Sequence, residues 1–296
     1  MSIKKMILAA SLGLAALSAS ATPLDSLTGN MNIKLQGLTT EANTFGGTNE
    51  STWGVGSITQ ITGTGGQAWN MGVSDGSYLY YMIYGIADQN IVNNSTGSLD
   101  LYNVGATGGV GDGKIHLDIY RSNVNILELT SDFNAQVGDR TGYNMHSLLS
   151  GLGPAYLTVE FGTGKQTTNV AGGLNPGADE TLATLVQVVT SATLPAAGTG
   201  QFFADVTGGT AAAQWDSNGL FGHDLDGKFT LSTNGASQGS GVCTDEEVLG
   251  SPGNPATCFT GFINDPIRAI RVPEPGSLAL VGLGLVGLAG LRRRMA

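Results

Sequence analysis

Runs rich in Val, Ile, Thr, Tyr and Phe recur between residues 31 and 234, and in several of them apolar and polar positions alternate. In one segment, for example, Ile115, Leu117 and Ile119 fall on one face of an extended chain, and His116 and Asp118 fall on the other. Alternation of this kind predicts strands with one buried face. Eight strands are predicted, at 31–38, 52–61, 77–87, 98–104, 114–121, 155–162, 200–208 and 227–234.

Helical periodicity is scarce by comparison. Residues 133–152 are predicted to be helical in part at most, and 179–189 open with acidic residues, as helices do, but end in β-branched residues that suit a strand. Glycine makes up 46 of the 296 residues, about twice its usual share of ~7%, and gathers in turns such as 111–114 and 224–228. Short strands joined by glycine-rich turns predict one all-β domain, a β-sandwich or jelly roll.

Two apolar segments lie outside this pattern, and the first occupies residues 6–17. Lys4 and Lys5 precede it, and the small residues Ala19 and Ala21 follow it, which is the order of a cleaved secretory signal peptide. An uncleaved anchor is disfavoured because about twelve apolar residues fall short of the ~20 that a membrane-spanning helix needs. We therefore expect export by the Sec machinery and cleavage after Ala21.

The second apolar segment occupies residues 276–291. It contains no charge, and Arg292, Arg293 and Arg294 follow it directly. A helix of this length measures roughly 24 Å, slightly less than the ~30 Å hydrocarbon core of a bilayer. The adjoining arginines still favour a transmembrane helix whose basic end stays in the cytoplasm. The body of the chain would then lie outside the inner membrane.

These features divide the chain into four parts. They are a signal peptide at 1–21, an all-β extracellular domain at 22–235, a loop and spacer at 236–271, and a C-terminal membrane segment at 272–296. The whole chain has 23 acidic and 13 basic residues, of which one acidic and five basic residues lie in the two end segments. The body therefore keeps 22 acidic and 8 basic residues, a formal charge of −14. Such a body would repel phosphates, which argues against a nucleic-acid partner.

Cys243 and Cys258 are the only cysteines, and both belong to the part expected to be exported. An even number of cysteines in an oxidising compartment favours a disulfide. Closing this loop would contribute roughly 3 kcal/mol. The alternative of two free thiols or a metal pair is disfavoured, because a metal site would need further His or Cys nearby.

No motif for an enzyme occurs in the sequence: a nucleophile elbow, a phosphate-binding loop and a dinucleotide fingerprint are all missing. We therefore expect a protein that is not an enzyme and assign no catalytic residue. Glycoside hydrolysis would need paired carboxylates, for which Asp118, Glu128 and Glu160 are candidates, but such residues also form the solvent face of strands. Aromatic side chains could stack on sugars or serve the core. They are Trp53, Trp69, Tyr80, Tyr84 and Trp215.

One acidic stretch, at 216–229, carries oxygen-bearing side chains at alternate positions. Asp216 and Asn218 precede one glycine, and Asp224 and Asp226 precede another, an arrangement that can wrap Ca²⁺. The full twelve-residue calcium loop is missing, since no glutamate closes it. Two Asx-rich turns are therefore favoured over a metal site, and we expect no cofactor, with Ca²⁺ as the one candidate.

The C-terminal segment resembles the PEP-CTERM sorting signal, found on exported proteins of Gram-negative bacteria that make extracellular polysaccharide. Val272, Pro273, Glu274 and Pro275 resemble its name-giving motif, followed by the apolar run and the three arginines. The resemblance implies processing by an exosortase, an inner-membrane enzyme that cuts at or near the motif. The prolines favour an extended peptide, which a protease groove accepts.

The resemblance implies a precursor tethered to the inner membrane that faces the periplasm and is then delivered to the cell surface or the extracellular matrix. There we expect a structural or adhesive role in exopolysaccharide or biofilm. The alternative is a carbohydrate-binding or polysaccharide-active protein on a jelly-roll scaffold. The resemblance covers about 25 of 296 residues and implies nothing about the body.

Overall fold

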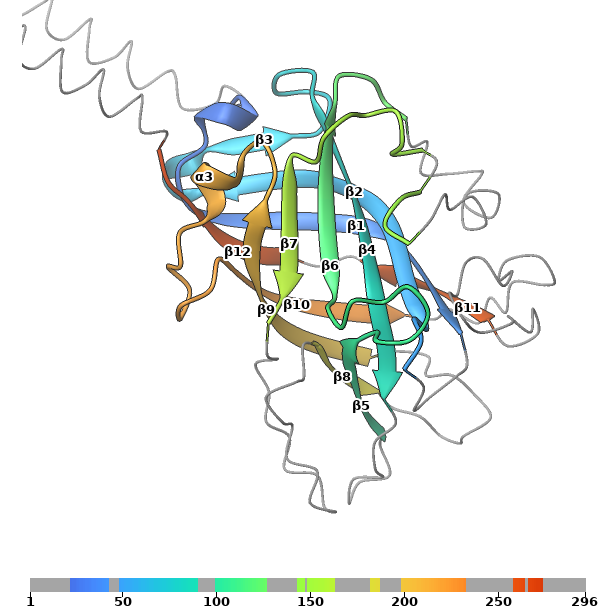
Figure 1. Ribbon diagram of the computed structural model, residues 1–296. Coiled ribbons are helices and arrows are strands. Elements are labelled where there is room, and N and C mark those ends of the chain that lie inside the picture. The colour runs from blue at the N-terminus through green and yellow to red at the C-terminus, as the bar shows by residue number, and fades with distance from the viewer. Residues whose placement is uncertain are drawn as a thin grey trace, which may run out of the picture.

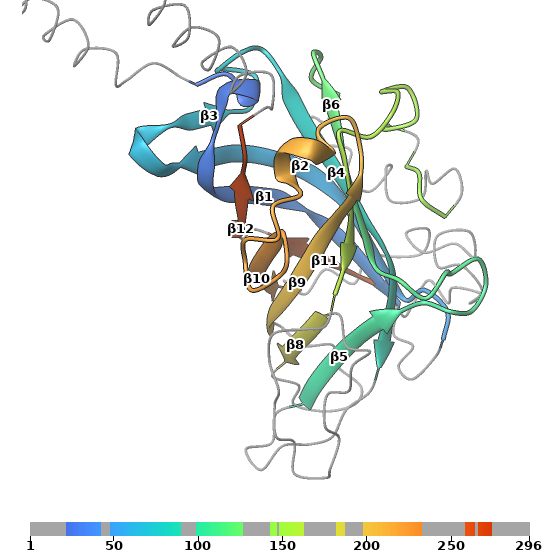
Figure 2. The ribbon, with the colours of Figure 1, turned by 60° about the vertical axis from the view of Figure 1, so that its left-hand side comes forward.

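The computed structural model describes residues 22–42, 48–89, 99–126, 143–146, 148–162, 182–186, 198–232, 258–263 and 266–273. Twelve strands run through these residues, and every pairing between them is antiparallel (Figures 1 and 2). The strands are β1 (Gly29–Ala42), β2 (Thr52–Gly63), β3 (Ala68–Asn70), β4 (Tyr78–Gln89), β5 (Leu99–Gly105), β6 (His116–Ser122), β7 (Leu157–Phe161), β8 (Leu182–Val186), β9 (Gly198–Gly208), β10 (Leu225–Ser232), β11 (Cys258–Ile263) and β12 (Pro266–Arg271).

The eight predicted strands are confirmed as β1, β2, β4, β5, β6, β7, β9 and β10. The segment left open between helix and strand holds strand β8. The described residues of 133–152 hold no helix. Helical structure in the described residues comprises η2 (Leu24–Ser26), η3 (Thr64–Gly66) and α3 (Ala212–Trp215). An all-β domain is therefore confirmed.

The strands close into a barrel. Eight of them form a ring in the order β1, β2, β4, β6, β7, β9, β10 and β12, and β12 pairs with β1 to complete it. The predicted sandwich or jelly roll is therefore wrong. Alternation along one strand shows which residues face a core, but it does not show which strand lies beside it. This ring closes through the pairing of β1 with β12, which is more than 220 residues away in the sequence, and β11 also pairs with both β1 and β10.

A second set of strand pairings extends the barrel past the ends of the short strands β6 and β7. The last residues of β4 pair with β5, and β8 joins β5 to the first residues of β9. In Figure 1, β5 and β8 lie below β6 and β7. Strand β11 pairs with the later parts of β1 and β10, next to β12, and β3 pairs with β2. Each long strand thus has different neighbours along its length.

The barrel interior is the main hydrophobic core. The inward positions of β6 and β7 confirm the predicted alternation: Leu117 and Ile119 on β6 and Val159 and Phe161 on β7 are buried in one cluster with the side chains of the other strands. Trp69, Trp215 and Leu24 belong to the same cluster and have 2% exposure or less. At about 25 cal/mol per Å² of apolar area, this interior supplies most of the stabilising free energy.

A second hydrophobic cluster covers the outer side of β2, β4 and β6. Trp53, Tyr80, Met82 and Tyr120 are buried there, and Leu149 from the segment between β6 and β7 packs on them. The outer faces of these strands are therefore not solvent-facing, although the period-2 pattern alone treats them as polar. A segment far along the chain covers aromatic residues that the alternation leaves exposed.

Three sequence predictions lie wholly or partly outside the described residues. The described part of the chain holds no helix long and apolar enough to cross a membrane, and the predicted segment at 276–291 falls outside it, as do Ala19 and Ala21. Cys258 begins β11, whereas Cys243 lies outside, so the disulfide stays a prediction. Residues 258–263 and 266–271, assigned from sequence to a loop and spacer, form β11 and β12.

Candidate functional site

Three segments that are distant in sequence meet at one end of the barrel: η2 near the start of the described chain, α3, and the last residue of β12. Figure 1 shows the first and last described segments side by side at this end. We call it the Arg271 end, and define it by residues 22–27, α3 and 271–273. Its arrangement decides how the C-terminal segment leaves the barrel.

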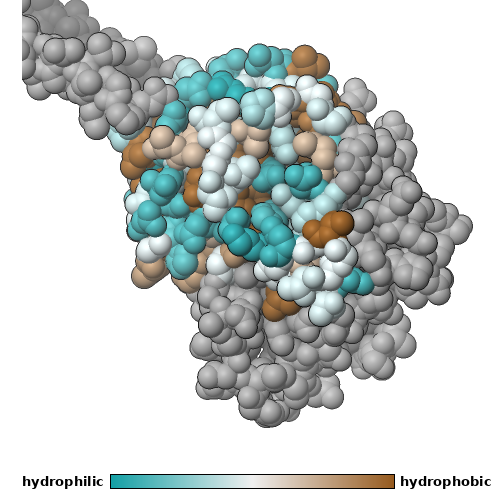
Figure 3. Space-filling model, in the orientation of Figure 1, coloured by the Kyte–Doolittle hydropathy of each residue, from teal (hydrophilic) through white to brown (hydrophobic). Residues whose placement is uncertain are grey.

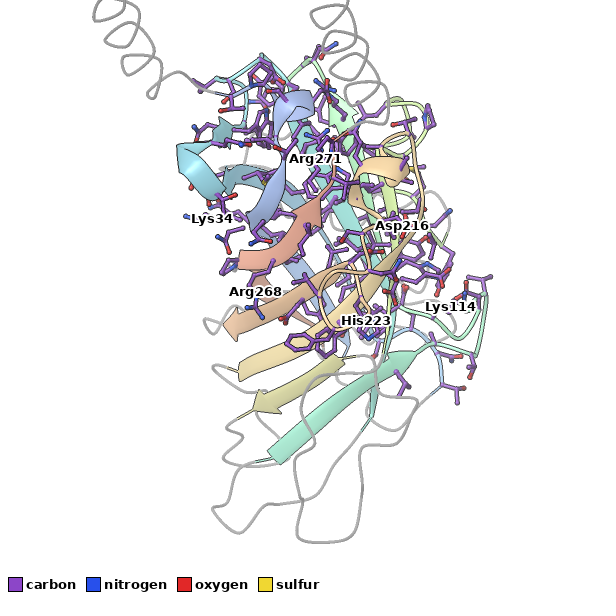
Figure 4. All side chains as sticks on the ribbon, turned by 90° about the vertical axis from the view of Figure 1, so that its left-hand side faces the viewer. Lys34, Lys114, Asp216, His223, Arg268 and Arg271 are labelled. Carbon is purple, nitrogen blue, oxygen red and sulfur yellow. The ribbon has the colours of Figure 1, made fainter. Side chains whose placement is uncertain are left out.

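Arg271 holds these segments together from inside. Its side chain is 1% exposed, donates to the Leu24 carbonyl of η2 and to Oε1 of Gln214 on α3, and lies 5.4 Å from the centre of the Trp215 ring. Figure 4 shows it between η2 and α3. Burial of a guanidinium is costly unless hydrogen bonds and nearby groups offset the desolvation of its charge. Arg271 therefore fixes the end of β12 to both segments.

Asp75 and Arg121 hold η2 from the other side. The backbone N–H of Leu24 donates to Asp75 at 2.9 Å, and Trp69 Nε1 donates to the same carboxylate at 3.0 Å. Arg121 Nη1 lies 2.8 and 2.9 Å from the two oxygens of Asp25. Burial alone would raise the pKa of Asp75, but hydrogen bonds from Ser77, Leu24 and Trp69 outweigh it and lower the pKa to about 2.

This lowered pKa predicts an acid-sensitive contribution to stability. A carboxyl whose pKa is lower in the folded than in the unfolded chain stabilises the fold above its unfolded pKa of 3.8 and loses that contribution as the pH falls toward 2. We expect Asp75→Asn to lower the free energy of unfolding by about 1 kcal/mol near neutral pH, because solvent screens part of the interaction. The difference from the wild type should shrink between pH 4 and pH 2. Urea unfolding across that range measures it.

The control for this prediction is Asp216→Asn, which changes an exposed carboxylate. Its unfolding midpoints should follow those of the wild type at each pH. If the curves of the wild type and Asp75→Asn instead run parallel from pH 6 to pH 2, the hydrogen bonds to Asp75 do not produce the acid sensitivity.

The chain leaves the barrel directly after Arg271. The backbone N–H of Val272 donates to the Gln214 carbonyl at 2.8 Å, and Pro273 is exposed and is the last described residue. Glu274 and Pro275 alone separate it from the apolar run that begins at Gly276. Three extended residue steps span about 11 Å at most. The apolar run therefore begins within that distance of the barrel.

Comparison with known proteins identifies this exit segment. A family model described as the PEP-CTERM protein-sorting motif matches residues 271–294. The chain carries a PEP-CTERM sorting motif. The match confirms the resemblance that Val272 to Pro275 carry, and it begins at the buried last residue of β12. A protein with this motif is exported to the cell surface, and an exosortase is its processing partner. No curated protein and no solved structure matches the chain.

The residues considered for Ca²⁺ do not converge on a common point. Asp224 is 1% exposed and accepts the backbone N–H groups of Ser217, Asn218 and Val206. Asp226 is buried and pairs with Arg268. Asp216 accepts from the Asn218 side chain at 3.0 Å. Among the described residues, no three His, Cys, Asp or Glu side chains are grouped to hold a metal ion.

The aromatic residues considered for sugar stacking lie in the two hydrophobic clusters. Their exposure is 5% or less, which leaves their ring faces unavailable to a ligand from solvent. They are Trp53, Trp69, Tyr80, Tyr84 and Trp215. Of the two roles left open from sequence, these five residues have the core role.

The carboxylates considered for glycoside hydrolysis have separate surroundings. Asp118 on β6 is buried and accepts a hydrogen bond from the Tyr84 hydroxyl at 3.1 Å, and burial raises its pKa. Glu160 on β7 pairs with Lys114 at 2.5 Å on the surface, and Glu128 lies outside the described residues. Asp118 lies opposite Thr158 and Glu160 opposite His116, and the Leu117–Val159 pair lies between these two pairs of the ladder.

Sequence reasoning missed the residues that build the Arg271 end. Arg271 ends the sequence "PIRAIR", in which Ile267 and Ala269 face the core and Arg271 takes the next inward position. The alternation was therefore present, but an arginine at an inward position reads as polar and interrupts the apolar pattern. Asp75 and Arg121 gave no local signal, because their partners are distant in sequence.

Proposed function

We propose that this chain is a surface or matrix protein whose barrel is delivered by the sorting motif and freed from the membrane by cleavage at or near Val272 to Pro275. One observation carries the proposal: the sorting motif begins at the residue where the barrel ends. A cut beyond Pro273 would remove none of the contacts described for Arg271 and Val272. The mature barrel would therefore stay folded after processing.

The geometry also supports a defined orientation of the precursor. The apolar run starts within about 11 Å of the barrel, and its arginines would keep the far end in the cytoplasm. The Arg271 end would then face the inner membrane, and the exosortase would reach the motif at the membrane surface. A body with a formal charge of −14 would be repelled by anionic lipid, which favours release once the covalent link is cut.

A structural or adhesive role, rather than a catalytic one, is part of the proposal. The coloured part of the face in Figure 3 is a mosaic of hydrophilic and weakly hydrophilic residues in which hydrophobic surface is scattered. Such a surface suits a protein that stays soluble in a hydrated polysaccharide. Exopolysaccharide or biofilm would be its setting.

The test compares the mature C-terminus of two variants in the native host. We expect the wild-type protein to end between residues 272 and 275 and to leave the membrane fraction, and the triple variant Pro273→Ala, Glu274→Ala, Pro275→Ala to keep its tail and stay there. Pro252→Ala with Pro255→Ala is the control, since it removes two prolines outside the motif. Peptide mass spectrometry of the C-terminus gives the answer.

Retention of residues 276–296 on the mature wild-type protein would contradict the processing step. The adhesive role has its own readout in the same host, which is cell aggregation with and without the chain. Aggregation that is unchanged when the chain is deleted would contradict that role while leaving the processing step intact.

A further inference from the structure

The loop between α3 and β10, residues 216–223, has a fixed backbone. The two oxygens of Asp224 accept three backbone N–H groups: those of Ser217 and Asn218 at 2.6 Å each and that of Val206 on β9 at 2.9 Å. Leu220 and His223 exchange two backbone hydrogen bonds, at 2.9 and 3.0 Å. The acidic stretch considered above for Ca²⁺ therefore organises this loop with a carboxylate.

The loop at residues 216–223 exposes the aromatic ring of Phe221 to solvent. Phe221 has a φ of +59°, a left-handed conformation that bulky residues rarely adopt, and it is 81% exposed. Both features are unfavourable for folding, because the backbone is strained and an apolar ring lies in water. Residues held against local preference in this way cluster at functional sites.

Polar and aromatic groups adjoin this ring. The Phe203 ring lies 6.2 Å from that of Phe221, in an edge arrangement, and stacks on His223 at 4.8 Å. His223 Nδ1 lies 3.0 and 3.1 Å from the two oxygens of Asp205. The side chains of His223 and Asp205 stay 29% and 41% exposed. Figure 4 shows His223 on the same side of the barrel as Asp216 at the start of the loop.

We propose that Phe221, His223 and Asp205 form a binding subsite for one ring of a neutral saccharide. A sugar ring has a face of C–H groups that packs on an aromatic ring, and hydroxyls at its edge that donate to a carboxylate. Asp205 keeps free acceptor capacity beside its bond to His223, since a carboxylate has about four lone-pair sites. The subsite therefore offers both kinds of contact that such a ligand needs.

Two alternatives fit the surroundings less well. A protein-binding hot spot is enclosed by further apolar contacts, whereas the other strongly exposed large apolar residues in the described chain are Val73, Val110 and Val124, on different loops. An acidic sugar would meet Asp205 and, directly opposite it on β7, Glu160. The Lys114 ammonium is paired with Glu160, so it does not offset both of these negative charges. A neutral ligand avoids this repulsion.

A single ring on one aromatic residue binds weakly, with a Kd of roughly millimolar. Many barrels along one polymer would raise the overall affinity through multivalency. The subsite would thus suit a matrix protein, although the inference rests on the loop and not on the sorting motif.

The experiment is saturation-transfer NMR on the mature protein purified from its host. The probes are neutral gluco-, manno- and galacto-hexaoses, with an oligogalacturonate as the anionic comparison. We expect at least one neutral hexaose to bind, Phe221→Ala to weaken it at least tenfold, Phe221→Tyr to retain it and Asp205→Asn to weaken it several-fold. Val73→Ala, which shortens another strongly exposed apolar side chain on a different loop, should leave binding unchanged.

Three outcomes would overturn the proposal. The first is that no neutral hexaose binds at ten millimolar, and the second is that the wild type and Phe221→Ala bind equally. The third is a dimer in sedimentation that Phe221→Ala converts to a monomer, which would mean that the ring contacts a second copy of the chain. Thermal unfolding of each variant is recorded alongside. Because Phe221 is exposed, its removal should leave the midpoint unchanged or raised, so lost binding would not reflect lost folding.

Discussion

A chain that ends at Asp265 will fail to form the barrel, whereas one that ends at Pro273 will form it. Strand β12 lies between β1 and β10 and pairs with both. Its loss would expose the edges of β1 at residues 29–34 and of β10 at residues 225–227, which β11 does not cover. It would also remove the buried side chains of Ile267, Ala269 and Arg271. We expect a loss of more than about 5 kcal/mol, comparable with the whole stability of an ordinary domain.

The measurement is urea unfolding, followed by circular dichroism, of chains spanning 22–265 and 22–273, with the full mature protein as the reference. The shorter chain should also aggregate, since unpaired strand edges template intermolecular pairing. Equal unfolding midpoints for the two chains would contradict the closure of the barrel by β12. If the prediction holds, the barrel closes only after residue 271 has crossed the inner membrane, so folding follows export.

Gly56→Ala will lower the free energy of unfolding by about 3 kcal/mol or more. Gly56 and Gly37 face each other on β2 and β1, and Tyr81 lies opposite Gly56 on β4. A Cβ at Gly56 would lie 2.3 Å from the Gln36 carbonyl oxygen and 2.6 Å from the Tyr81 hydroxyl. The backbone atom has no room to move, and overpacking of this kind is destabilising.

Tyr81→Phe tests the contact between the Tyr81 hydroxyl and a Cβ added at Gly56. The Tyr81 hydroxyl is buried and has no hydrogen-bond partner among the described residues, and burial raises its pKa. Removing it should raise the free energy of unfolding by about 1 kcal/mol, and the double variant with Gly56→Ala should recover part of the loss. Gly151→Ala, where an added Cβ has open space, should change little. Independent effects of the two substitutions would contradict this packing.

The eight strands were predictable because their signal is local. Apolar side chains at every second position must share one face of a strand, whatever the strand pairs with. The short β3 and the two last strands were missed for different reasons. β3 has only three residues, whereas the turn-rich surroundings of β11 and β12 and the arginines at 268 and 271 obscured an alternation that is present in β12.

Some features of the candidate site were predictable from sequence and others were not, for the same reason. The sorting motif was recognisable because its proline motif, apolar run and arginines follow one another within residues 271–294. The role of Asp224 in holding the loop that exposes Phe221 was not recognisable from sequence. A carboxylate that holds a loop and one that binds calcium have the same spacing in sequence. Their partners decide between them, and Val206 belongs to another strand.

By itself, the sequence determined the sorting motif of the protein, its all-β class and most of its strands, since each depends on residues that are close together along the chain. Only the tertiary structure decided that the sheet closes, that the aromatic residues at 53, 69 and 215 are buried, and that the sorting motif starts at a buried arginine. These outcomes depend on pairings across more than 200 residues, such as β12 with β1, for which local periodicity carries no information.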